Sequence, residues 1–596
     1  MKDFFRSLLA SLVALGVFTG ICLVVLVAML AAMGSSRPVV APRSVLVLNL
    51  SGNFPDSVQD QGASAMFQKA MQGKEDEGIP LYSLLQGLER ASHDRSISAL
   101  YLTGNVNPAG YGSGPAALKE IREAIQRFRQ VSGKPVIAYN HVWTKREYYL
   151  CAGASRIYGN PAGEVDLTGL SAEPMFFGGA FKKYGVEVQV TRVGKYKSAV
   201  EPFILEKMSD ANREQMQSLL GDLWSEWKQA VASDRKLAPE AIQALADRQG
   251  MVTNPDAVQA HLLDQLASPD QVLGELKGLA GRRAEDPDLP QIDMANYLKL
   301  PMESKGKNRI AVVYAEGEIV DGQGQDGMVG GDSLSRELRK LRLDSHVKAI
   351  VLRVNSPGGS ALASDLIQRE VILARKAKPV VVSMGYLAAS GGYWISTYGD
   401  RIFAEPNTIT GSIGVFGLLP NVQKLANEHG ITWDSVQTAG MANPLTITRP
   451  KNPAELARVQ ALVDGIYGQF LDKVSDSRKI QREQVNEIAQ GRVWSGRQAL
   501  KLGLVDELGG LQDAIRYAAK TAKIEHDFHV DWPGEAKSPV EKLMKLLGGD
   551  KTPYSHTRMG PADAVRSELQ KALATVEALN DPQGVYARMP FELDLR

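Results

Sequence analysis

The sequence predicts an α/β protein that contains two copies of one ancestral unit. In each half, short apolar segments rich in β-branched residues alternate with longer helical patterns, which is typical of domains with parallel strands. Similar segments recur in the same order in the two halves of the 596-residue chain. A stretch of 26 uncharged residues precedes both halves. We therefore expect an N-terminal membrane helix followed by two related α/β domains.

Residues 8–33 are expected to form a transmembrane anchor after a tail at 1–7. As a helix, this uncharged stretch would be about 39 Å long at about 1.5 Å per residue, enough to span a bilayer. The apolar region of a secretory signal is shorter, about 7 to 15 residues, although small residues near 31–36 leave cleavage open. Positive charges lie on both sides of the span, so they do not decide its orientation. We expect the tail to be cytoplasmic.

The composition excludes some classes of protein. Apolar residues make up 44% of the chain, which is enough for sizeable cores, and the net charge is +1. This balance, without a long basic run, argues against nucleic acid as a partner. Cys22 and Cys151 are the two cysteines, and the first lies in the apolar stretch. We therefore expect no cysteine metal site.

The duplication is visible in four pairs of segments. The pairs are SVLVLNLSGNFPD (44–56) with IAVVYAEGEIVD (310–321), SALYLTGN (98–105) with KAIVLRVN (348–355), KPVI (134–137) with KPVV (378–381), and RIYGNP (156–161) with RIFAEP (401–406). The offset falls from 265 to 250 and then to 244 and 245, as expected for a copied unit altered by small insertions. We place the two domains at 44–286 and 308–540. A proline-bearing linker at 287–307 and a C-terminal extension at 541–596, whose role the sequence does not reveal, complete the division.

A hydroxyl-bearing turn stands out in the second copy. Residues 379–394 read PVVVSMGYLAASGGYW, in which a β-branched strand gives way to small residues around Ser390. The two glycines after Ser390 leave its oxygen and the next backbone N–H uncovered, as a nucleophile requires. Taken alone, however, a Ser-Gly-Gly sequence is more often a turn whose serine caps a helix.

A loop that could bind an oxyanion lies earlier in the same copy. The predicted strand at 349–354 ends in NSPGGS at 355–360, which can offer the N–H of Gly359 to a negative oxygen. Together with the N–H of Gly391, it would form an oxyanion hole. A Pro-Gly-Gly sequence by itself is more often an ordinary turn.

The general base has to come from outside the second copy, which offers no convincing candidate. His429 lies at a predicted helix C-terminus, where a solvated histidine is the ordinary explanation. With the local offset of 245, Ser390 falls opposite Lys145 of the first copy. Lys197 falls opposite Ala442, so that each copy holds one half of a site.

Lys197 lies in the segment GKYKSAVEPF at 194–203. A serine–lysine pair works only with a neutral lysine, and burial can lower the lysine pKa by several units from about 10.4. From the spacing alone, an ordinary ion pair with Glu201, four residues later on a helix, is the favoured alternative.

Several motifs together resemble the long, duplicated form of the signal peptide peptidase A (protease IV) family. They are LAASGGYW (387–394), the SPGG loop (356–359), TGSIGV (410–415), GKYKSAVEPF and GRVWSGRQALKLGLVDELGG (491–510). The similarity follows nearly the whole chain in order, including the N-terminal anchor. It implies tandem ClpP/crotonase-like domains and a membrane-anchored peptidase that degrades cleaved signal peptides.

The resemblance also assigns roles, residue by residue. It implies Ser390 as nucleophile, Lys197 as general base, Gly359 and Gly391 as oxyanion donors, and Ser412 as a support that holds the lysine. By itself, Ser412 would be a plain turn serine. Lys195 is the nearby rival for the base, and the family pattern favours Lys197. The first copy thus carries the lysine and the second the serine, without a metal or an organic cofactor.

The partners and the location follow from the same resemblance. It implies signal peptides and other unfolded or apolar peptides as substrates, contact with a lipid bilayer, and a homo-oligomer, with a tetramer as one candidate size. It places a single-pass protein in the bacterial inner membrane with its catalytic domains in the periplasm. Two other classes stay open at this point: an acyl-CoA-handling crotonase-like enzyme and a catalytically silent membrane scaffold. Peptide hydrolysis that depends on Ser390 would separate the peptidase from both.

Overall fold

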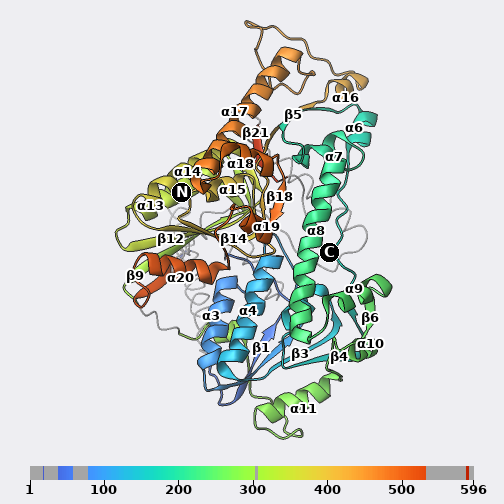
Figure 1. Ribbon diagram of the computed structural model, residues 1–596, viewed down its shortest axis with the longest axis vertical. Coiled ribbons are helices and arrows are strands. Elements are labelled where there is room, and N and C mark those ends of the chain that lie inside the picture. Colours follow the sequence, from blue (N-terminus) through green and yellow to red (C-terminus); the bar gives the residue numbers. More distant parts are fainter. Residues whose placement is uncertain are drawn as a thin grey trace, which may run out of the picture.

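The computed structural model describes residues 38–57, 78–301, 306–325, 327–531 and 585–589, together with residues 16 and 18. These residues form three sheets with helices packed against them (Figure 1). The predicted tail at 1–7 lies outside the described residues, and so does the predicted anchor at 8–33 apart from those two positions. Among the helices that are described, none has the length and apolarity needed to cross a membrane.

The first copy is built around one sheet with the order β6-β4-β3-β2-β1-β8. Its strands are β1 (Ser44–Asn49), β2 (Ile97–Thr103), β3 (Val136–Trp143), β4 (Arg156–Asp166), β6 (Met251–Thr253) and β8 (Gln291–Asp293), and β7 (Gln265–Leu266) pairs with β4. The helices of this copy are α3 (Leu81–His93), α4 (Pro115–Ser132), α5 (Lys145–Cys151), α8 (Asp210–Arg235), α9 (Pro239–Arg248), α10 (Asn254–Gln259), α11 (Pro269–Leu279) and α12 (Met294–Leu298). Strands β1 to β4 are parallel neighbours, as the alternating pattern predicts.

Helix α4 shows how local signals set these elements. Pro115 occupies its first turn, where a missing N–H does no harm, and Gly133 ends it in the left-handed conformation with φ 66°. Between them, Leu118, Ile121 and Ile125 recur at helical spacing and are buried. The helix therefore turns this apolar stripe towards the core of the first copy.

Part of the predicted linker at 287–307 belongs to the fold instead. Residues 291–293 form β8, which pairs in parallel with β1, and residues 294–298 form α12. Met294 and Tyr297 are buried, and the Tyr297 hydroxyl donates to Asp94 at 2.9 Å. The prolines and charges of this segment led to the prediction of a linker. β8 and α12 are too short for their apolar residues to show a recognisable periodicity.

The second copy repeats the strand order of the first. Its sheet runs β18-β16-β14-β12-β9-β20, position for position like β6-β4-β3-β2-β1-β8. The strands are β9 (Asn308–Glu316), β12 (Val347–Ser356), β14 (Val380–Ala389), β15 (Arg401–Ala404), β16 (Ile409–Gly411), β18 (Val493–Ser495), β19 (Glu507–Leu508) and β20 (Phe528–Asp531). The helices are α13 (Gly331–Leu343), α14 (Ala361–Arg375), α15 (Gly391–Ser396), α16 (Gln423–Glu428), α17 (Pro453–Arg478), α18 (Arg482–Ile488), α19 (Gly496–Lys501) and α20 (Leu511–Thr521). The predicted duplicated α/β architecture is confirmed, and it fits a duplicated ClpP-like fold. We keep the domain limits 44–286 and 308–540 as a proposal.

A third sheet takes strands from both copies and from the C-terminal extension. Its order is β11 (Met328–Gly330), β10 (Glu318–Val320), β13 (Gly358–Ser360), β21 (Val585–Arg588), β17 (Val415–Asn421) and β5 (Glu187–Val193). β5 of the first copy pairs antiparallel with β17 of the second over their full lengths. This pairing carries α6 (Gly178–Tyr184) and α7 (Glu201–Ile204) to the end of the molecule where α16 lies (Figure 1). The segment that follows β5 is thereby placed against the second copy.

Helix α8 is a second link between the copies. It runs lengthwise from the first copy towards the second (Figure 1), and polar side chains along it meet β18 and α19. Gln215 accepts the backbone N–H of Val493 at 3.4 Å, and Glu226 forms an ion pair with Arg497. The two copies are therefore joined through both a sheet and a helix.

Candidate active site

Ser390 lies at a strained turn between β14 and α15. Its backbone has φ 55° and ψ −111°, a conformation that residues with a side chain rarely adopt and that costs on the order of 1–3 kcal/mol. The turn is held by hydrogen bonds from Ser390 N to Gly411 O and from Trp394 N to Ser390 O, both 2.8 Å long. A Cβ on Gly392 would lie 2.6 Å from Ser356 O, so only glycine allows the turn to pack against the end of β12.

Lys197 reaches this serine from the first copy. Its Nζ lies 2.8 Å from Ser390 Oγ, 3.0 Å from Ser412 Oγ and 3.2 Å from Ser412 O. The side chains of Lys197, Ser390 and Ser412 are all fully buried. Lys197 lies four residues after the end of β5, which pairs with β17 of the second copy, so this contact depends on the shared third sheet.

Burial favours the neutral form of Lys197. It lowers the pKa of the Lys197 amine well below its usual value of 10.5, because the charged form loses its hydration. The alternative ion pair with Glu201 is not formed. The Glu201 carboxylate instead accepts hydrogen bonds from Ser209 N at 3.1 Å, Ser209 Oγ at 2.5 Å and Asn212 Nδ2 at 3.1 Å. Lys195, the rival base, is exposed with its Nζ 4.7 Å from the centre of the Tyr196 ring.

Two glycines that the sequence analysis did not single out make room for the lysine stem. A Cβ on Gly491 would lie 2.7 Å from Lys197 Cβ, and one on Gly414 would lie 3.2 Å from Lys197 Cδ. Gly491 also has φ 76°, which favours glycine independently. Gly491 is the first residue of GRVWSGRQALKLGLVDELGG and Gly414 lies in TGSIGV, so the glycines of these two motifs were the signal that could have identified them.

The two predicted oxyanion loops lie side by side. Gly359 belongs to β13, and Gly391 is the first residue of α15. A Cβ on the neighbouring Gly358 would lie 2.5 Å from Gly391 N, and one on Gly359 would lie 1.9 Å from Ile319 O. The two glycines of the Pro-Gly-Gly sequence therefore do more than form a turn. They allow the backbone of β13 to lie close to Ile319 and to the first residue of α15.

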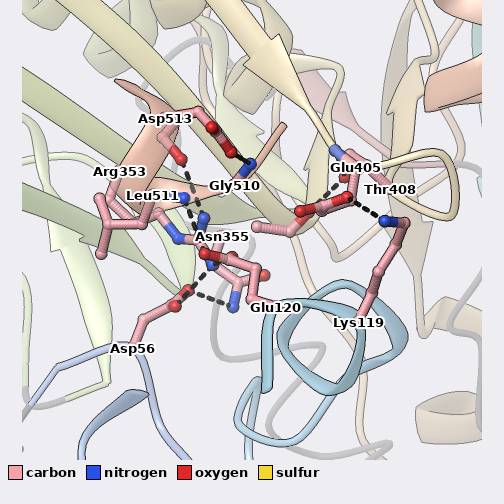
Figure 2. Close-up of polar contacts among 12 residues, drawn as sticks. Asp56, Lys119, Glu120, Arg353, Asn355, Glu405, Thr408, Gly510, Leu511 and Asp513 are labelled. Atoms are coloured by element: carbon pink, nitrogen blue, oxygen red, sulfur yellow. Dashed lines mark hydrogen bonds and ion pairs between the residues drawn. The ribbon is translucent and has the colours of Figure 1, made fainter. Parts of the chain in front are cut away.

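A buried polar network supports the first of these loops from the other copy (Figure 2). Asn355, at the end of β12, accepts Leu387 N at 3.1 Å and donates to Asp56 Oδ2 at 3.0 Å. Arg353 Nη2 donates to Asp56 Oδ1 and to Glu120 Oε1, both at 2.8 Å. Burial opposes the charge of Arg353, but the two carboxylates outweigh it and raise its pKa. Sequence reasoning missed this network, although an arginine inside the apolar strand AIVLRVN is an unusual residue.

The corresponding turn of the first copy has no such pair. β3 ends at Trp143 as β14 ends at Ala389, so Thr144 takes the place of Ser390, one residue before the predicted Lys145. The offset between the copies is 244 where the two strands begin, at Val136 and Val380, and 246 where they end, so the offset of 245 is one residue off at this turn. Lys145 Nζ lies 2.8 Å from Asp166 Oδ2 and 2.7 Å from Thr168 Oγ1.

A buried hydroxyl in contact with a lysine amine, next to two glycine-lined loops, is an arrangement typical of serine hydrolases. The model of peptidase family S49 matches residues 128–283 and 372–525, one match in each copy, and the chain belongs to this family. The chain is 36% identical over 567 residues to protease 4 of Salmonella typhi, which covers 91% of this chain and 90% of that protein. It is 34% identical over 617 residues to protease 4 of Haemophilus influenzae, covering 98% and 96%. It is 32% identical over 515 residues to the chloroplastic serine protease SPPA of Arabidopsis thaliana, covering 85% and 73%.

The family settles the class of enzyme. The chain is a serine peptidase, as the resemblance to signal peptide peptidase A implied. The acyl-CoA enzyme and the silent scaffold are therefore not supported. The roles of individual residues, the substrates and the membrane location are taken up below as proposals.

Proposed function

We propose that the chain hydrolyses peptides with a dyad of Ser390 and Lys197, one residue from each copy. The observation that carries this proposal is the 2.8 Å distance between Lys197 Nζ and Ser390 Oγ, for a fully buried lysine without an ion-pair partner among the described residues. An amine in this position is neutral at working pH and can accept a proton. The strained turn holds the serine hydroxyl towards it.

The mechanism follows from this geometry. Neutral Lys197 takes the proton of Ser390, and the alkoxide attacks a peptide carbonyl. The N–H groups of Gly359 and Gly391 stabilise the negative oxygen of the tetrahedral intermediate. Lys197, now charged and close to both oxygens of Ser412, gives its proton to the leaving amine. Water activated by Lys197 then releases the acyl group from Ser390, which restores the starting state.

Replacing Ser390 with alanine tests the nucleophile. We expect Ser390→Ala to lower kcat for an apolar peptide substrate by on the order of 10⁴-fold or more, since no acyl-enzyme can form. Circular dichroism and the Tm should stay near those of the parent, because alanine fits the space of the serine. Retained hydrolysis at the parental rate would refute the dyad.

The pH profile tests the protonation state of Lys197. The base must be neutral, so kcat/KM should rise with pH through the pKa of Lys197 in the free enzyme. Because burial lowers that pKa well below 10.5, the rise should be complete far below pH 10.5. The rate at which Ser390 reacts with a fluorophosphonate should show the same pH dependence. A rise that begins only near 10.5 would mean that Lys197 is charged in the resting enzyme.

We further propose the setting in which this peptidase works. The uncharged stretch at 8–33 supports a single-pass anchor in the bacterial inner membrane, with the catalytic domains in the periplasm. An enzyme anchored there would meet cleaved signal peptides and other apolar peptides, which we propose as substrates. A homo-oligomer, with a tetramer as one candidate, remains part of this proposal.

A further inference from the structure

A pocket in the first copy occupies the position that the proposed dyad has in the second. Its volume is about 220 Å³, and it is lined by residues 110–115, at the start of α4, and by Thr144 and Lys145, which follow β3. The corresponding segments of the second copy precede α14 and follow β14, where they contain the proposed oxyanion glycines and Ser390. The first copy therefore has a cleft at the place of the active site, with different side chains in it.

The turn after β3 lacks the reactive groups of its counterpart. Thr144 has φ −76° and ψ 167°, which are ordinary extended values, and its hydroxyl donates to the buried carboxylate of Glu147. Lys145 Nζ is engaged by Asp166 Oδ2 at 2.8 Å and by Thr168 Oγ1 at 2.7 Å. The hydroxyl and the amine of this turn are thus committed to the protein itself. Neither attacks a peptide, and the paired amine does not call for an anionic ligand.

Two buried side chains of the pocket lining carry polar atoms without a partner. Tyr149 is 4% and Asn407 is 5% exposed. Neither Tyr149 Oη nor Asn407 Oδ1 has a hydrogen-bond partner in the part of the chain that the structure describes. Asn407 Nδ2 donates to Pro115 O at 2.9 Å, which leaves its oxygen to accept, and burial raises the pKa of Tyr149, so that its hydroxyl stays protonated and can donate. Because unpartnered buried polar atoms are unfavourable, these two indicate a ligand that satisfies both.

The remaining walls of the pocket are largely apolar and come from both copies. They include the aromatic and leucine side chains of Tyr111, Leu118, Leu170, Leu223, Trp227 and Tyr386. The Trp227 indole is held in place by its Nε1, which donates to Lys145 O at 3.0 Å. An apolar cavity of about 150 Å³ is large enough for benzene, so this pocket can enclose an aromatic side chain. A peptide group would supply both the N–H for Asn407 and the carbonyl for Tyr149.

We propose that this pocket is a second, non-catalytic binding site for apolar peptides. It takes an aromatic side chain between its apolar walls and one peptide group against Tyr149 and Asn407. A peptide held here is bound but not cut, because the turn at Thr144 has no activated nucleophile. The site goes beyond the proposed dyad, since its binding of peptides does not depend on whether Ser390 is the nucleophile.

Calorimetric titration of the full-length Ser390→Ala protein with acetyl-Leu-Phe-Leu-amide tests the site. Tyr149→Phe should raise the Kd by roughly three- to tenfold, because one hydrogen bond to the ligand is lost. The Tm should not fall, since this hydroxyl has no partner to lose. Leu170→Trp should raise the Kd by roughly tenfold or more, because the indole takes the space of the ligand's ring.

The neighbouring tyrosine provides a matched control. The Tyr148 hydroxyl donates to Leu262 O at 2.7 Å and does not line the pocket. Tyr148→Phe should therefore lower the Tm and leave the Kd unchanged, the opposite of Tyr149→Phe. As a second probe, acetyl-Leu-Ala-Leu-amide should bind at least roughly tenfold more weakly than the phenylalanine peptide, because no ring is buried.

The outcomes separate this inference from the proposed dyad. Unless the Kd rises in both pocket variants and stays constant in the control, the pocket does not bind peptides and the inference is overturned. A peptide that binds only at the active site would show one Kd in all variants, and a pocket filled by water alone would give no saturable binding. Equal affinity for the alanine probe would also overturn it. Hydrolysis of an apolar ester by the parent chain reports on the dyad separately, and its absence would refute the dyad without changing the comparison of Kd values.

Discussion

Replacing Lys197 with alanine lowers kcat for peptide hydrolysis by on the order of 10⁴-fold in the mechanism that we propose, the upper end of what one general base contributes. The lysine amine is the group that receives the Ser390 proton, and its Nζ lies 2.8 Å from the serine oxygen. Lys197→Arg should be as inactive, because a guanidinium stays charged and cannot accept a proton. Single-turnover kinetics with an apolar ester, which separates acylation from release, would measure the loss at the first step.

Lys195 provides a matched control for this prediction. It lies two residues earlier in the same segment, but its side chain is exposed and its Nζ lies over the Tyr196 ring. Lys195→Ala should therefore keep kcat within about twofold, as is usual for a surface replacement away from a site. An inactive Lys195→Ala together with an active Lys197→Ala would transfer the role of base to Lys195.

The parts of the fold that could be predicted are those that local patterns determine. The repeated segments predicted two α/β copies, and their sheets have the same strand order. The third sheet could not be foreseen, because β5 and β17 come from different copies and β21 comes from the C-terminal extension. Nothing in an isolated strand specifies a partner hundreds of residues away. Short segments such as β8, with three residues, also carry too little periodicity to distinguish them from a linker.

The same distinction applies to the site. The Ser-Gly-Gly turn pointed to Ser390, the comparison of the copies pointed to Lys197, and the resemblance assigned their roles. The role of Ser412 came from resemblance alone, and the structure places its Oγ 3.0 Å from Lys197 Nζ. The network of Asp56, Glu120 and Arg353 escaped notice because its members are far apart in the sequence. In the sequence they are three ordinary charged residues. Their interaction becomes apparent only in the structure, where all three are buried and Arg353 donates to both carboxylates.

That network supports the second prediction with a large effect. Arg353→Met should destabilise the protein by about 3–5 kcal/mol, because it leaves the carboxylates of Asp56 and Glu120 buried without their cation. Arg353 is buried and donates to both of them at 2.8 Å (Figure 2). Methionine fills a similar space, so the loss comes from charge and not from a cavity. Thermal unfolding at neutral pH, followed by circular dichroism, would show the lowered Tm.

The pH dependence and a compensating variant identify the cause of this loss. Burial already raises the pKa of Glu120, and removal of Arg353 should raise it further. A carboxyl whose pKa is higher in the folded than in the unfolded state favours folding at low pH and loses that effect as pH rises through the folded pKa. The Tm deficit of Arg353→Met should therefore shrink from pH 8 towards pH 5. Adding Asp56→Asn and Glu120→Gln removes both charges and should restore most of the Tm at neutral pH. A deficit that stays constant with pH, or a triple variant as unstable as the single one, would instead point to lost packing around Arg353.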